Sequence, residues 1–471
     1  MRKTKIICTM GPSCESVEVL KELIGAGMNV ARLNLAHGDV EEQRKRIRTI
    51  RQAAAETGAH IAIMLDIKGP EVRIGLLKDK SYELKAGERL TLTTERIEGD
   101  AGRISVSYQE LPQDVRPGNS ILIDDGLIEL KVLEVMGTEV HCRIVNGGVI
   151  KPRKGVNLPG IRTSLPGVTE RDVQHILFGI EENIDMIAVS FVRRAEDIMQ
   201  IREMLESRKA GHIQLISKIE NEEGVEALDA ILAVSDGLMV ARGDLGVEIP
   251  VEDVPLIQKQ MIHKCNLAGK PVITATHMLD SMQSNPRPTR AEASDVANAV
   301  LDGTDVIMLS GETAAGKYPV ESVRTMAAIA EKAESIIPYQ EQLAAKSALR
   351  KADTTEVISQ SVVSASLDLD AKAIITPTES GFTARMVSKY RPKAPIIAVT
   401  PHDEVLRRMS LVWGVIPVKG PVVETTDAMF QSALDNGAKT GLFAEGDLVV
   451  ISAGVPVGKS GTTNLIKIQQ V

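Results

Sequence analysis

A lysine and two carboxylates stand at the ends of two apolar runs near the middle of the chain. One run ends in Lys218 and Glu220, and the next run ends at Ala241 and leads through Gly243 to Asp244. A short apolar run is typical of a buried strand, and charge at its end indicates the mouth of that strand. Two carboxylates at neighbouring strand mouths suit a hard divalent cation, and a lysine beside them can neutralise a phosphoryl group.

The elements that must position these residues alternate along most of the chain. Apolar runs are separated by amphipathic helical segments, such as 17–24 and 254–267, and this alternation favours a parallel sheet. Eight such units predict an α/β fold with a closed (β/α)₈ TIM barrel. The runs lie near Ile6, Val30, Ile61, Met186, Leu215, Leu238, Val272 and Val306.

Polar or charged residues follow seven of these eight runs. In a (β/α)₈ barrel the carboxyl ends of all strands lie on one face, and that face carries the active site. Glu220 and Asp244 could instead cap helices or form ion pairs, and Thr276 and Ser310 could be ordinary helix caps. The concentration at seven strand ends favours a functional site. The residues at these strand ends are Arg32, Asn34, Asp66, Lys68, Ser190, Lys218, Glu220, Arg242, Asp244, Thr274, Thr276, Ser310 and Glu312, and Ile67 lies between Asp66 and Lys68.

The alternation breaks in one internal segment and changes again near the end of the chain. Residues 71–166 show short strands with glycine turns, which predicts a small β-barrel lid inserted over the mouth of a barrel formed by 1–70 and 167–337. Within it, Asp124 and Asp125 are expected to form a hairpin turn and not a ligand pair. Residues 338–471 are expected to form a third domain, which begins with a helix at 339–352 and continues as an α/β unit with its own sheet.

Composition excludes several classes of protein. The 471 residues are 43% hydrophobic and only 2% aromatic, which suits an aliphatic parallel α/β interior. A net charge of -8 argues against a nucleic-acid binder, whose phosphate contacts need a basic surface. The four cysteines show no disulfide or zinc spacing, so a reducing cytoplasm is expected. No stretch approaches the about 18 apolar residues of a membrane span, so no membrane partner is expected.

At these residues the chain resembles the pyruvate kinase family, and the resemblance extends over essentially its whole length. The segments that carry it are Cys8–Ser13, Ala31–Asn34, Asp66–Arg73, Lys154–Gly160, Ile216–Asn221, Met239–Glu248, Met278–Met282, Asn285–Glu292 and Met308–Ala314. The resemblance implies a catalytic barrel, an inserted β lid and a C-terminal α/β regulatory domain. It also implies transfer of the phosphoryl group of phosphoenolpyruvate to ADP, which gives pyruvate and ATP.

The resemblance assigns roles at the barrel mouth by position. Glu220 and Asp244 correspond to Mg²⁺ ligands, and Lys218 corresponds to the lysine that stabilises the phosphoryl group in flight. Arg32 corresponds to the arginine that grips that group. Gly243, together with Asp244, offers backbone N–H groups to the substrate carboxylate.

The same resemblance assigns further positions. Thr276 contacts the substrate near the carbon to be protonated, and a water relay through Thr276 and Ser310 is expected, since a hydroxyl is not itself a strong acid. Asn34 and Asp66, with the carbonyl of Ile67, correspond to ligands of K⁺. The positions that correspond to nucleotide contacts are Asn34, His37, Arg73 and Lys154.

Two residues depart from the family pattern. The family usually has a serine where this chain has Ala36, so one oxygen of the K⁺ site is missing, although Glu71 matches the form of the family that needs potassium. His277 stands where glutamine or lysine is commoner, and little effect is expected from it.

In the last domain a hydroxyl-rich segment follows an expected strand and opens a helix. Thr378, Ser380, Gly381 and Thr383 could cradle the phosphate of a sugar-phosphate effector, or they could form an ordinary capped helix start. Segment 460–463 could form a second wall of this site. The resemblance also implies a homotetramer, and the chain is expected to lack the extra C-terminal phosphotransfer-like domain of some bacterial relatives.

Two other functions compete with the kinase. One is a catalytically impaired relative that only binds sugar phosphates, and the departures at Ala36 and His277 are its only support. The other is a barrel enzyme that performs a lyase or mutase reaction on the same substrate, and the inserted lid argues against it.

Overall fold

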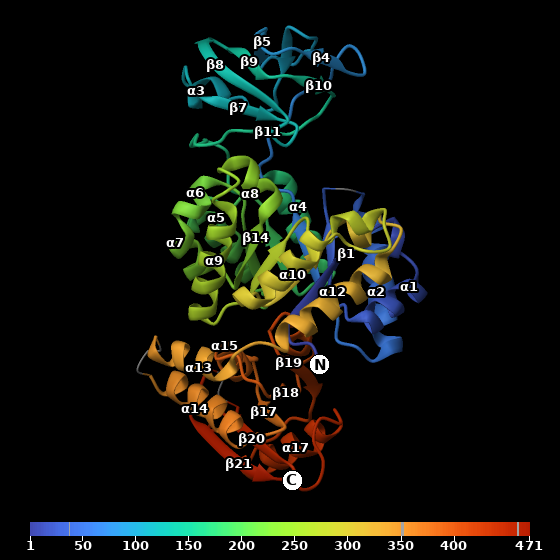
Figure 1. The fold of residues 1–471 in the computed structure, drawn as a ribbon, viewed down its shortest axis with the longest axis vertical. Coiled ribbons are helices and arrows are strands. Elements are labelled where there is room, and N and C mark those ends of the chain that lie inside the picture. Colours follow the sequence, from blue (N-terminus) through green and yellow to red (C-terminus); the bar gives the residue numbers. More distant parts are fainter. Residues whose placement is uncertain (37, 350–352, 459–460) are drawn as a thin grey trace.

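The computed structural model describes residues 1–36, 38–349, 353–458 and 461–471. Three parts follow one another along the long axis of the molecule (Figure 1). A β-rich lid lies at one end, the α/β barrel lies in the middle, and the C-terminal α/β domain lies at the other end. The amino terminus lies at the junction between the barrel and the C-terminal domain.

The barrel contains eight parallel strands that close into a ring in the order β1-β16-β15-β14-β13-β12-β3-β2. All eight expected strands are confirmed. Nearly every strand residue is buried, because helices cover the outside and side chains fill the inside. The strands are β1 (Lys5–Thr9), β2 (Val30–Asn34), β3 (Ala62–Ile67), β12 (Met186–Val189), β13 (Gln214–Ile219), β14 (Gly237–Ala241), β15 (Val272–Ala275) and β16 (Val306–Leu309).

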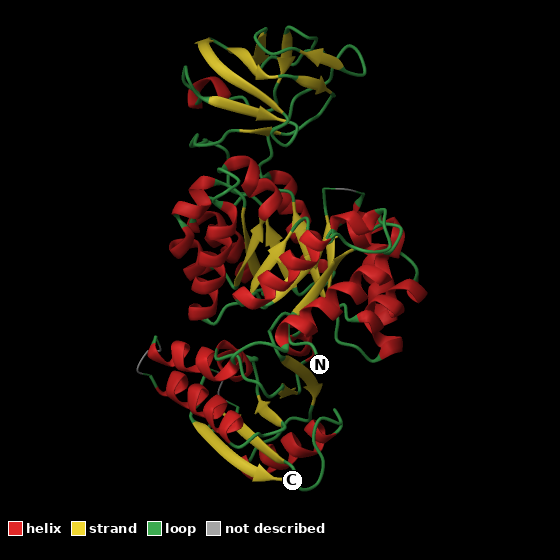
Figure 2. Ribbon diagram, in the orientation of Figure 1, coloured by secondary structure: helices red, strands yellow, loops and turns green. Residues whose placement is uncertain are grey.

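Helices surround the barrel, as Figure 2 shows. The two amphipathic segments expected at 17–24 and 254–267 are α1 and α9. An aliphatic cluster fills the ring, and a larger one lies between strands and helices. The helices are α1 (Val17–Ala26), α2 (Val40–Thr57), α4 (Glu170–Glu181), α5 (Ala195–Ser207), α6 (Glu222–Glu226), α7 (Leu228–Val234), α8 (Arg242–Glu248), α9 (Val254–Ala268), α10 (Arg290–Asp302), α11 (Gly311–Ala314) and α12 (Pro319–Glu334), with 3₁₀ turns η1 (Pro12–Cys14) and η2 (Asp280–Gln283).

Polar side chains at the amino end of the barrel follow a regular pattern. The pattern concerns every second barrel strand, namely β2, β12, β14 and β16. The residue directly before each of these strands accepts a backbone N–H from the first or second residue of the preceding barrel strand. The acceptors are Asn29, Asp185, Asp236 and Asp305, and the donors are Ile6, Ile63, Leu215 and Val272. Each acceptor also contacts one arginine, and in the same order these are Arg2, Arg407, Arg202 and Arg391. Arg2 and Arg202 belong to the barrel, and Arg407 and Arg391 come from the C-terminal domain.

The lid between β3 and β12 contains a six-stranded sheet in the order β11-β7-β8-β9-β5-β6 and a two-stranded sheet, β10-β4. The segment Arg73–Ile74 links the two edge strands of the larger sheet, because it forms isolated bridges to Gly155, next to β11, and to Val106, next to β6. The expected small β-barrel is therefore closed loosely. The elements are β4 (Tyr82–Leu84), β5 (Arg89–Thr93), β6 (Arg103–Ser105), α3 (Leu111–Asp114), β7 (Ser120–Ile123), β8 (Ile128–Met136), β9 (Glu139–Asn146), β10 (Gly148–Ile150) and β11 (Val156–Asn157).

The turn expected at Asp124–Gly126 joins β7 to β8. Asp124 and Asp125 have φ values of 58° and 55°, and Gly126 has a φ of 85°. Aspartate tolerates this left-handed region better than most residues, so the residue types suit a hairpin turn.

The C-terminal domain has a five-stranded sheet in the order β19-β18-β17-β20-β21. The helix expected at 339–352 is present as α13, and residues 350–352 lie outside the described part of the chain. The sequence did not predict β21, which pairs antiparallel with β20. The elements are α13 (Tyr339–Ala348), α14 (Thr354–Asp368), β17 (Ala373–Pro377), α15 (Phe382–Lys389), β18 (Ile396–Thr400), α16 (Asp403–Met409), β19 (Val415–Lys419), α17 (Thr426–Ala438), β20 (Leu448–Ala453) and β21 (Leu465–Gln470). Among the described residues, no helix combines the length and apolar character needed to cross a bilayer.

Candidate active site

Charged residues converge at the carboxyl end of the barrel. Arg32, Asp66 and Lys218 are not in the loops after their strands but belong to β2, β3 and β13, and Glu220 follows β13 directly. Arg32 and Lys218 are each 9% exposed, and Asp66 and Glu220 are 2% and 1% exposed. Because charged side chains are rarely buried unless they are paired, this burial points to interactions among them.

Asp66 connects the two cations. Its Oδ2 accepts a hydrogen bond from Arg32 Nε at 2.7 Å, and its Oδ1 lies 3.3 Å from Lys218 Nζ. Ser190 Oγ donates to the same Oδ1 at 3.3 Å. Burial alone would raise the pKa of Asp66, but Arg32 and Lys218 outweigh burial and lower that pKa below its usual value. Asp66 therefore holds both cations in place and stays ionised.

Lys218 bridges Asp66 and Glu220. Its Nζ lies 2.9 Å from Glu220 Oε1 and donates to Ser190 Oγ at 2.8 Å. Burial would lower the pKa of Lys218, but the carboxylates of Asp66 and Glu220 outweigh it and raise that pKa. Lys218 is therefore a permanent, immobilised positive charge at the barrel mouth.

The charged form of Glu220 is disfavoured by its surroundings, although Lys218 forms an ion pair with it. Its Oε2 accepts the backbone N–H of Phe191 at 2.6 Å. Burial raises the pKa of Glu220 to about 7; Lys218 counteracts this shift and Asp244 adds to it. Asp244 lies in α8, which begins directly after β14.

The carboxylates of Glu220 and Asp244 suit a hard cation. A buried carboxyl beside a second carboxylate is stabilised in its charged form when a cation binds between them. Oxygen donors of this kind suit Mg²⁺, which usually keeps several waters and substrate oxygens in its coordination sphere. Among the described residues, no group of three or more His, Cys, Asp or Glu side chains is placed to hold a metal ion.

The loop after β15 is held in a strained conformation beside this cluster. Thr276 and His277 have φ values of 65° and 51°, which residues other than glycine rarely adopt. Thr276 Oγ1 accepts the N–H of Gly243 at 2.8 Å and donates to the carbonyl of Ala275 at 2.7 Å. Arg242 donates to the carbonyl of Thr276 at 2.7 Å. The N–H of Gly243, expected to serve a substrate carboxylate, is thus bonded to Thr276 here.

The predicted K⁺ ligands meet at one edge of the barrel mouth. Asn34 and Asp66 are register partners on β2 and β3, and Ile67 is the last residue of β3. Asn34 Oδ1 accepts the N–H of Ala36 at 3.0 Å. All three ligands would supply oxygen atoms, as an alkali cation requires, but Asp66 also accepts a hydrogen bond from Arg32.

Two families of protein domain match this chain. A model of the pyruvate kinase barrel domain matches residues 1–323, and a model of the pyruvate kinase alpha/beta domain matches residues 356–469. The pyruvate kinase of Geobacillus stearothermophilus is 57% identical over 472 residues, and that of Bacillus licheniformis is 56% identical over 473. These matches cover 100% of this chain and 80% and 81% of the relatives.

The chain belongs to the pyruvate kinase family. It is a phosphotransferase, and the reaction of the family transfers the phosphoryl group of phosphoenolpyruvate to ADP. Pyruvate kinases generally need a divalent metal ion and K⁺. The reading of the chain as an impaired relative is not favoured by this degree of identity.

The nucleotide positions expected of a pyruvate kinase lie partly in the lid. Arg73 forms an ion pair with Glu71 and donates to the carbonyl of Arg153 at 2.7 Å. Lys154 Nζ lies 2.6 Å from Asp124 Oδ1. Neither cation contacts the cluster around Lys218 in this structure, and His37 lies outside the described residues.

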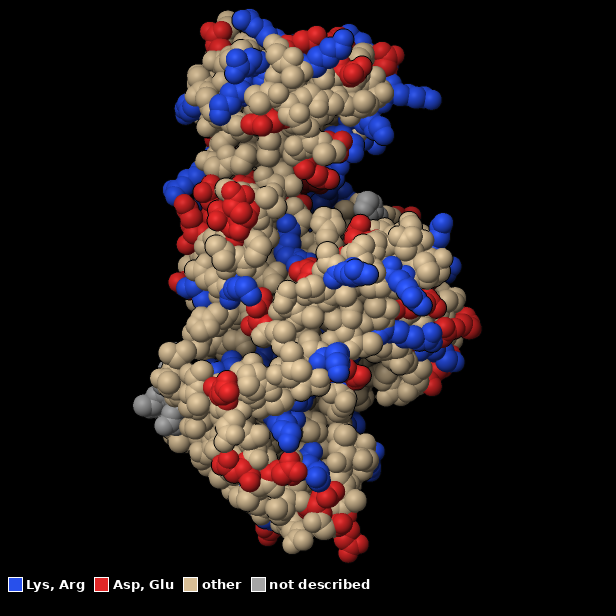
Figure 3. Space-filling view, in the orientation of Figure 1, with Lys and Arg blue, Asp and Glu red and all other residues tan. Residues whose placement is uncertain are grey.

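A cleft of about 310 Å³ separates the lid from the barrel. Lid residues around Asn157 form one wall, and Phe191, Asn221 and Asp244 of the barrel form the other. Asn157 Nδ2 donates to Glu248 Oε1 at 2.8 Å, so the lid touches α8 at one side of this cleft. Figure 3 shows a hollow between lid and barrel, with Lys and Arg side chains at its rim.

The hydroxyl-rich loop of the C-terminal domain forms a small pocket of about 50 Å³. The N–H of Gly381 donates to Thr378 Oγ1 at 3.0 Å, and Thr383 Oγ1 lies 3.0 Å from Thr463 Oγ1. Ser380 also lines this pocket. The two expected walls, 378–383 and 460–463, therefore meet, although Ser460 lies outside the described residues.

Three contributors to the site were not given a role from the sequence. Thr9 Oγ1 accepts from Arg32 NH1 at 2.9 Å, and Ser190 binds both Asp66 and Lys218. Glu312, 1% exposed, accepts the N–H of Ser310 at 2.7 Å and that of Leu279 at 3.0 Å. Ser190 and Glu312 were noted at strand ends, which was the available signal, whereas Thr9 is an ordinary-looking strand residue.

Proposed function

We propose that the cluster at the carboxyl end of the barrel performs the transfer of the phosphoryl group from phosphoenolpyruvate to ADP. The observation that supports this most strongly is the continuous chain of contacts from Arg32 through Asp66 and Lys218 to Glu220, all buried. Two fixed cations next to a carboxylate pair suit a phosphoryl group held by electrostatics, since such a reaction needs positioning more than covalent chemistry.

Glu220 and Asp244 are the proposed ligands of Mg²⁺. When bound there, the ion would neutralise charge on the substrate oxygens and favour the enolate of pyruvate. The raised pKa of Glu220 and the proximity of Asp244 support this choice. The remaining ligands are oxygens of the substrate and of water.

Arg32 and Lys218 are the proposed clamps of the phosphoryl group. Arg32 is held by Asp66 through Nε and by Thr9 through NH1, and these contacts fix the plane of its guanidinium. Lys218 is held by Ser190 and two carboxylates, so its ammonium does not have to be ordered when substrate arrives. Such pre-organisation lowers the entropy cost of reaching the transition state.

ADP is proposed to bind through Arg73 and Lys154 of the lid, together with Asn34 and His37 of the barrel. Arg73 and Lys154 each pair with a carboxylate in this structure, Glu71 and Asp124 respectively. Phosphate oxygens of ADP therefore have to replace these partners, and movement of the lid toward the barrel would bring the cations to the nucleotide.

Thr276 and Ser310 are the proposed path for the proton that reaches the methylene carbon of the enolate. The Thr276 hydroxyl donates to the carbonyl of Ala275, so it has to turn before it can deliver a proton. A water molecule relays the proton in this scheme, because an alcohol is too weak an acid to supply it alone. Gly243 and Asp244 are proposed to bind the substrate carboxylate once the Gly243 N–H is released.

K⁺ is proposed to bind Asn34, Asp66 and the carbonyl of Ile67, with water in place of the oxygen that Ala36 lacks. The pocket of Thr378, Ser380, Gly381 and Thr383 is the proposed site of a phosphorylated effector, such as a sugar phosphate or a nucleotide. We further propose that the protein acts in the cytoplasm as a homotetramer.

Pyruvate formation from phosphoenolpyruvate, ADP and Mg²⁺ tests the assignment, first with K⁺ and then with K⁺ replaced by tetramethylammonium. Turnover that requires K⁺ is the expected result. Turnover that is indifferent to K⁺ would remove the cation assignment but keep the kinase. Absence of turnover in both media, with sugar phosphates added, would favour the impaired, sugar-phosphate-binding alternative.

A further inference from the structure

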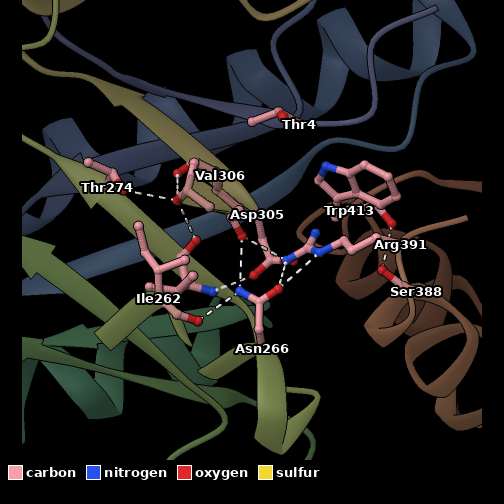
Figure 4. Close-up of polar contacts among 12 residues, drawn as sticks. Thr4, Ile262, Asn266, Thr274, Asp305, Val306, Ser388, Arg391 and Trp413 are labelled. Carbon is pink, nitrogen blue, oxygen red and sulfur yellow. Dashed lines mark hydrogen bonds and ion pairs between the residues drawn. The ribbon is translucent and has the colours of Figure 1, made fainter. Parts of the chain in front are cut away.

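Arg391 joins the C-terminal domain to the barrel through a dense set of buried contacts (Figure 4). Its Nε and NH2 donate to Asn266 Oδ1 at 3.1 and 2.8 Å, and NH2 also donates to the carbonyl of Gly303 at 2.8 Å. Its NH1 lies 2.9 Å from Asp305 Oδ1, an ion pair outside hydrogen-bond geometry. Arg391 and Asp305 are 5% and 6% exposed.

Asp305 connects Arg391 to three barrel strands. Its Oδ2 accepts the N–H of Val272, the first residue of β15, at 2.9 Å. Its carbonyl accepts the N–H of Lys5, the first residue of β1, at 2.9 Å, and β16 begins directly after it. The opposite end of β15 leads to Thr276, and the opposite end of β16 leads to Ser310.

On its other side, Arg391 follows the helix that starts at the proposed effector loop. Helix α15 begins at Phe382, next to Gly381 of that loop, and ends at Lys389. It is only eight residues long, so roughly 12 Å separates the loop from the end of the helix. Arg391 lies two residues beyond the end of this helix, so a rigid-body displacement of the helix at the loop would also move Arg391.

The backbone of Arg391 is strained. Its φ is 53°, in the left-handed region that a non-glycine residue adopts only when its surroundings compensate. Trp413, the only tryptophan of the chain, stacks on the guanidinium, whose central carbon lies 4.8 Å from the ring centroid. Trp413 is 3% exposed. This indole is consequently a built-in reporter of the position of Arg391.

A matched arrangement elsewhere in the barrel takes its arginine from the barrel and not from the C-terminal domain. Asp236 accepts the N–H of Leu215 at 2.8 Å and pairs with Arg202 at 2.7 Å, as Asp305 does with Val272 and Arg391. Arg202, however, lies in barrel helix α5. The pair supports the same kind of strand start with an arginine of the barrel, although Asp236 also lies within electrostatic reach of Arg385 in α15.

We propose that Arg391 is a positioning residue that couples the loop of residues 378–383 to the barrel strands that end at Thr276 and Ser310. The coupling to an effector rests on the proposed function of that loop. The connection between Arg391 and the strand ends stands on the contacts of Asp305 and Asn266 alone. Ligand at either site then shifts the arrangement at Arg391, and the effect is reciprocal.

The first experiment uses the emission of Trp413 in the full-length protein. Phosphoenolpyruvate with Mg²⁺ is titrated into the unsubstituted protein and into R391M, R391K and R202M. A change in Trp413 emission is expected in the unsubstituted protein and in R202M. It is expected to be lost in R391M and reduced in R391K, which keeps the charge but not the planar fork.

The second experiment measures the half-saturating phosphoenolpyruvate concentration with and without glucose 6-phosphate, whose binding is followed separately by equilibrium dialysis. We expect glucose 6-phosphate to lower that concentration by about fivefold or more in the unsubstituted protein and in R202M. In R391M the two values should agree within about twofold, with binding of glucose 6-phosphate and kcat at saturating substrate retained.

The outcomes separate the two proposals. Absence of glucose 6-phosphate binding to the unsubstituted protein would count against the effector assignment, and the Trp413 response to substrate would then decide the role of Arg391. An equal Trp413 response in R391M and in the unsubstituted protein would overturn the coupling. A response lost equally in R202M would overturn it too, because the effect would then be general to this end of the barrel. If R391M does not fold, the Trp413 responses of R391K and R202M are compared instead. A smaller response in R391K than in R202M supports the coupling, and equal responses overturn it.

Discussion

The two ends of the barrel both bury charged residues, but they arrange them differently. At the amino end, each carboxylate bonds to one strand N–H and one arginine, as Asp236 does with Leu215 and Arg202. At the carboxyl end, Arg32, Asp66, Lys218 and Glu220 contact one another in one network, and Asp244 lies close enough to raise the pKa of Glu220. There the carboxylates of Asp66, Glu220 and Asp244 outnumber the cations Arg32 and Lys218.

This difference separates structural charge from functional charge. Each carboxylate at the amino end contacts its own arginine, so part of its cost of burial is offset locally. Glu220 instead shares Lys218 with Asp66 and lies near Asp244, and burial raises its pKa to about 7. Burial also raises the pKa of Asp185 at the amino end, so the shared lysine, and not the raised pKa, distinguishes Glu220. Functional sites typically keep groups of this kind, whose charge is completed only by a ligand.

The largest effect on the requirement for a ligand is expected when a carboxylate is removed at the carboxyl end. Asp244→Asn should raise the half-saturating Mg²⁺ concentration by about 100-fold, which corresponds to about 2.7 kcal/mol, because one anionic ligand is lost. A Mg²⁺ titration of turnover at saturating substrates measures it.

Asp236→Asn is the matched control at the amino end of the barrel. It removes a carboxylate of similar setting, so the Mg²⁺ requirement should stay as in the unsubstituted protein. Equal Mg²⁺ curves for the two variants would contradict the distinction between the two ends.

A smaller effect is expected in the lid. Arg73→Met should raise the KM for ADP by about tenfold, or about 1.4 kcal/mol, and leave the KM for phosphoenolpyruvate unchanged. Steady-state kinetics with each substrate varied in turn gives both values, and the control is Arg89→Met, which changes an exposed arginine of lid strand β5. If both KM values rose together, Arg73 would serve the fold of the lid and not the nucleotide.

Ala36→Ser tests the missing oxygen of the K⁺ site. The added hydroxyl should lower the half-saturating K⁺ concentration by about threefold, which corresponds to roughly 0.7 kcal/mol. K⁺ is titrated at constant ionic strength with tetramethylammonium as the replacement, because exposed charges respond to salt alone. An unchanged K⁺ requirement would indicate that residue 36 does not face the cation.

At the amino end the expected effect is on stability and its pH dependence. Burial, with a smaller effect of Arg2, lowers the pKa of Lys5 to about 7, whereas the lysine of an unfolded chain titrates at about 10. Between about pH 7 and pH 10 the unfolded chain therefore binds one more proton, so the free energy of unfolding rises with pH by up to about 1.4 kcal/mol per unit.

Lys5→Met should remove this contribution and flatten the rise. Urea unfolding followed by Trp413 emission at pH 7, 8 and 9 compares the two proteins, and the difference between them isolates Lys5. Parallel pH dependences would show that Lys5 keeps an ordinary pKa at the junction.

The sequence was sufficient for the fold wherever its periodicity was strong. The eight buried runs became the eight strands, because an aliphatic run flanked by helices has few other ways to be buried. Strand β21 was missed, because it is the half-exposed edge strand Leu465–Gln470 and lacks a continuous apolar pattern.

The sequence indicated which residues form the site, but it did not indicate which of them contact one another. Lys218 and Glu220 were recognisable because charge interrupts a buried run. The central position of Asp66 between Arg32 and Lys218 depends on the register of β2, β3, β12 and β13, which no local pattern encodes. For the same reason, Arg391 and Asp305, far apart in the chain, gave no sign of their pairing.

The most direct test of the account compares two buried lysines at opposite ends of the same barrel. Lys218→Met and Lys5→Met each remove one ammonium group, and kcat is measured at saturating phosphoenolpyruvate, ADP, Mg²⁺ and K⁺, with Trp413 emission as the check of folding. The account predicts that kcat falls by at least about 10³ in Lys218→Met, or about 4 kcal/mol, and stays within about twofold in Lys5→Met. A folded Lys218→Met variant that turns over within about tenfold of the unsubstituted protein would contradict it.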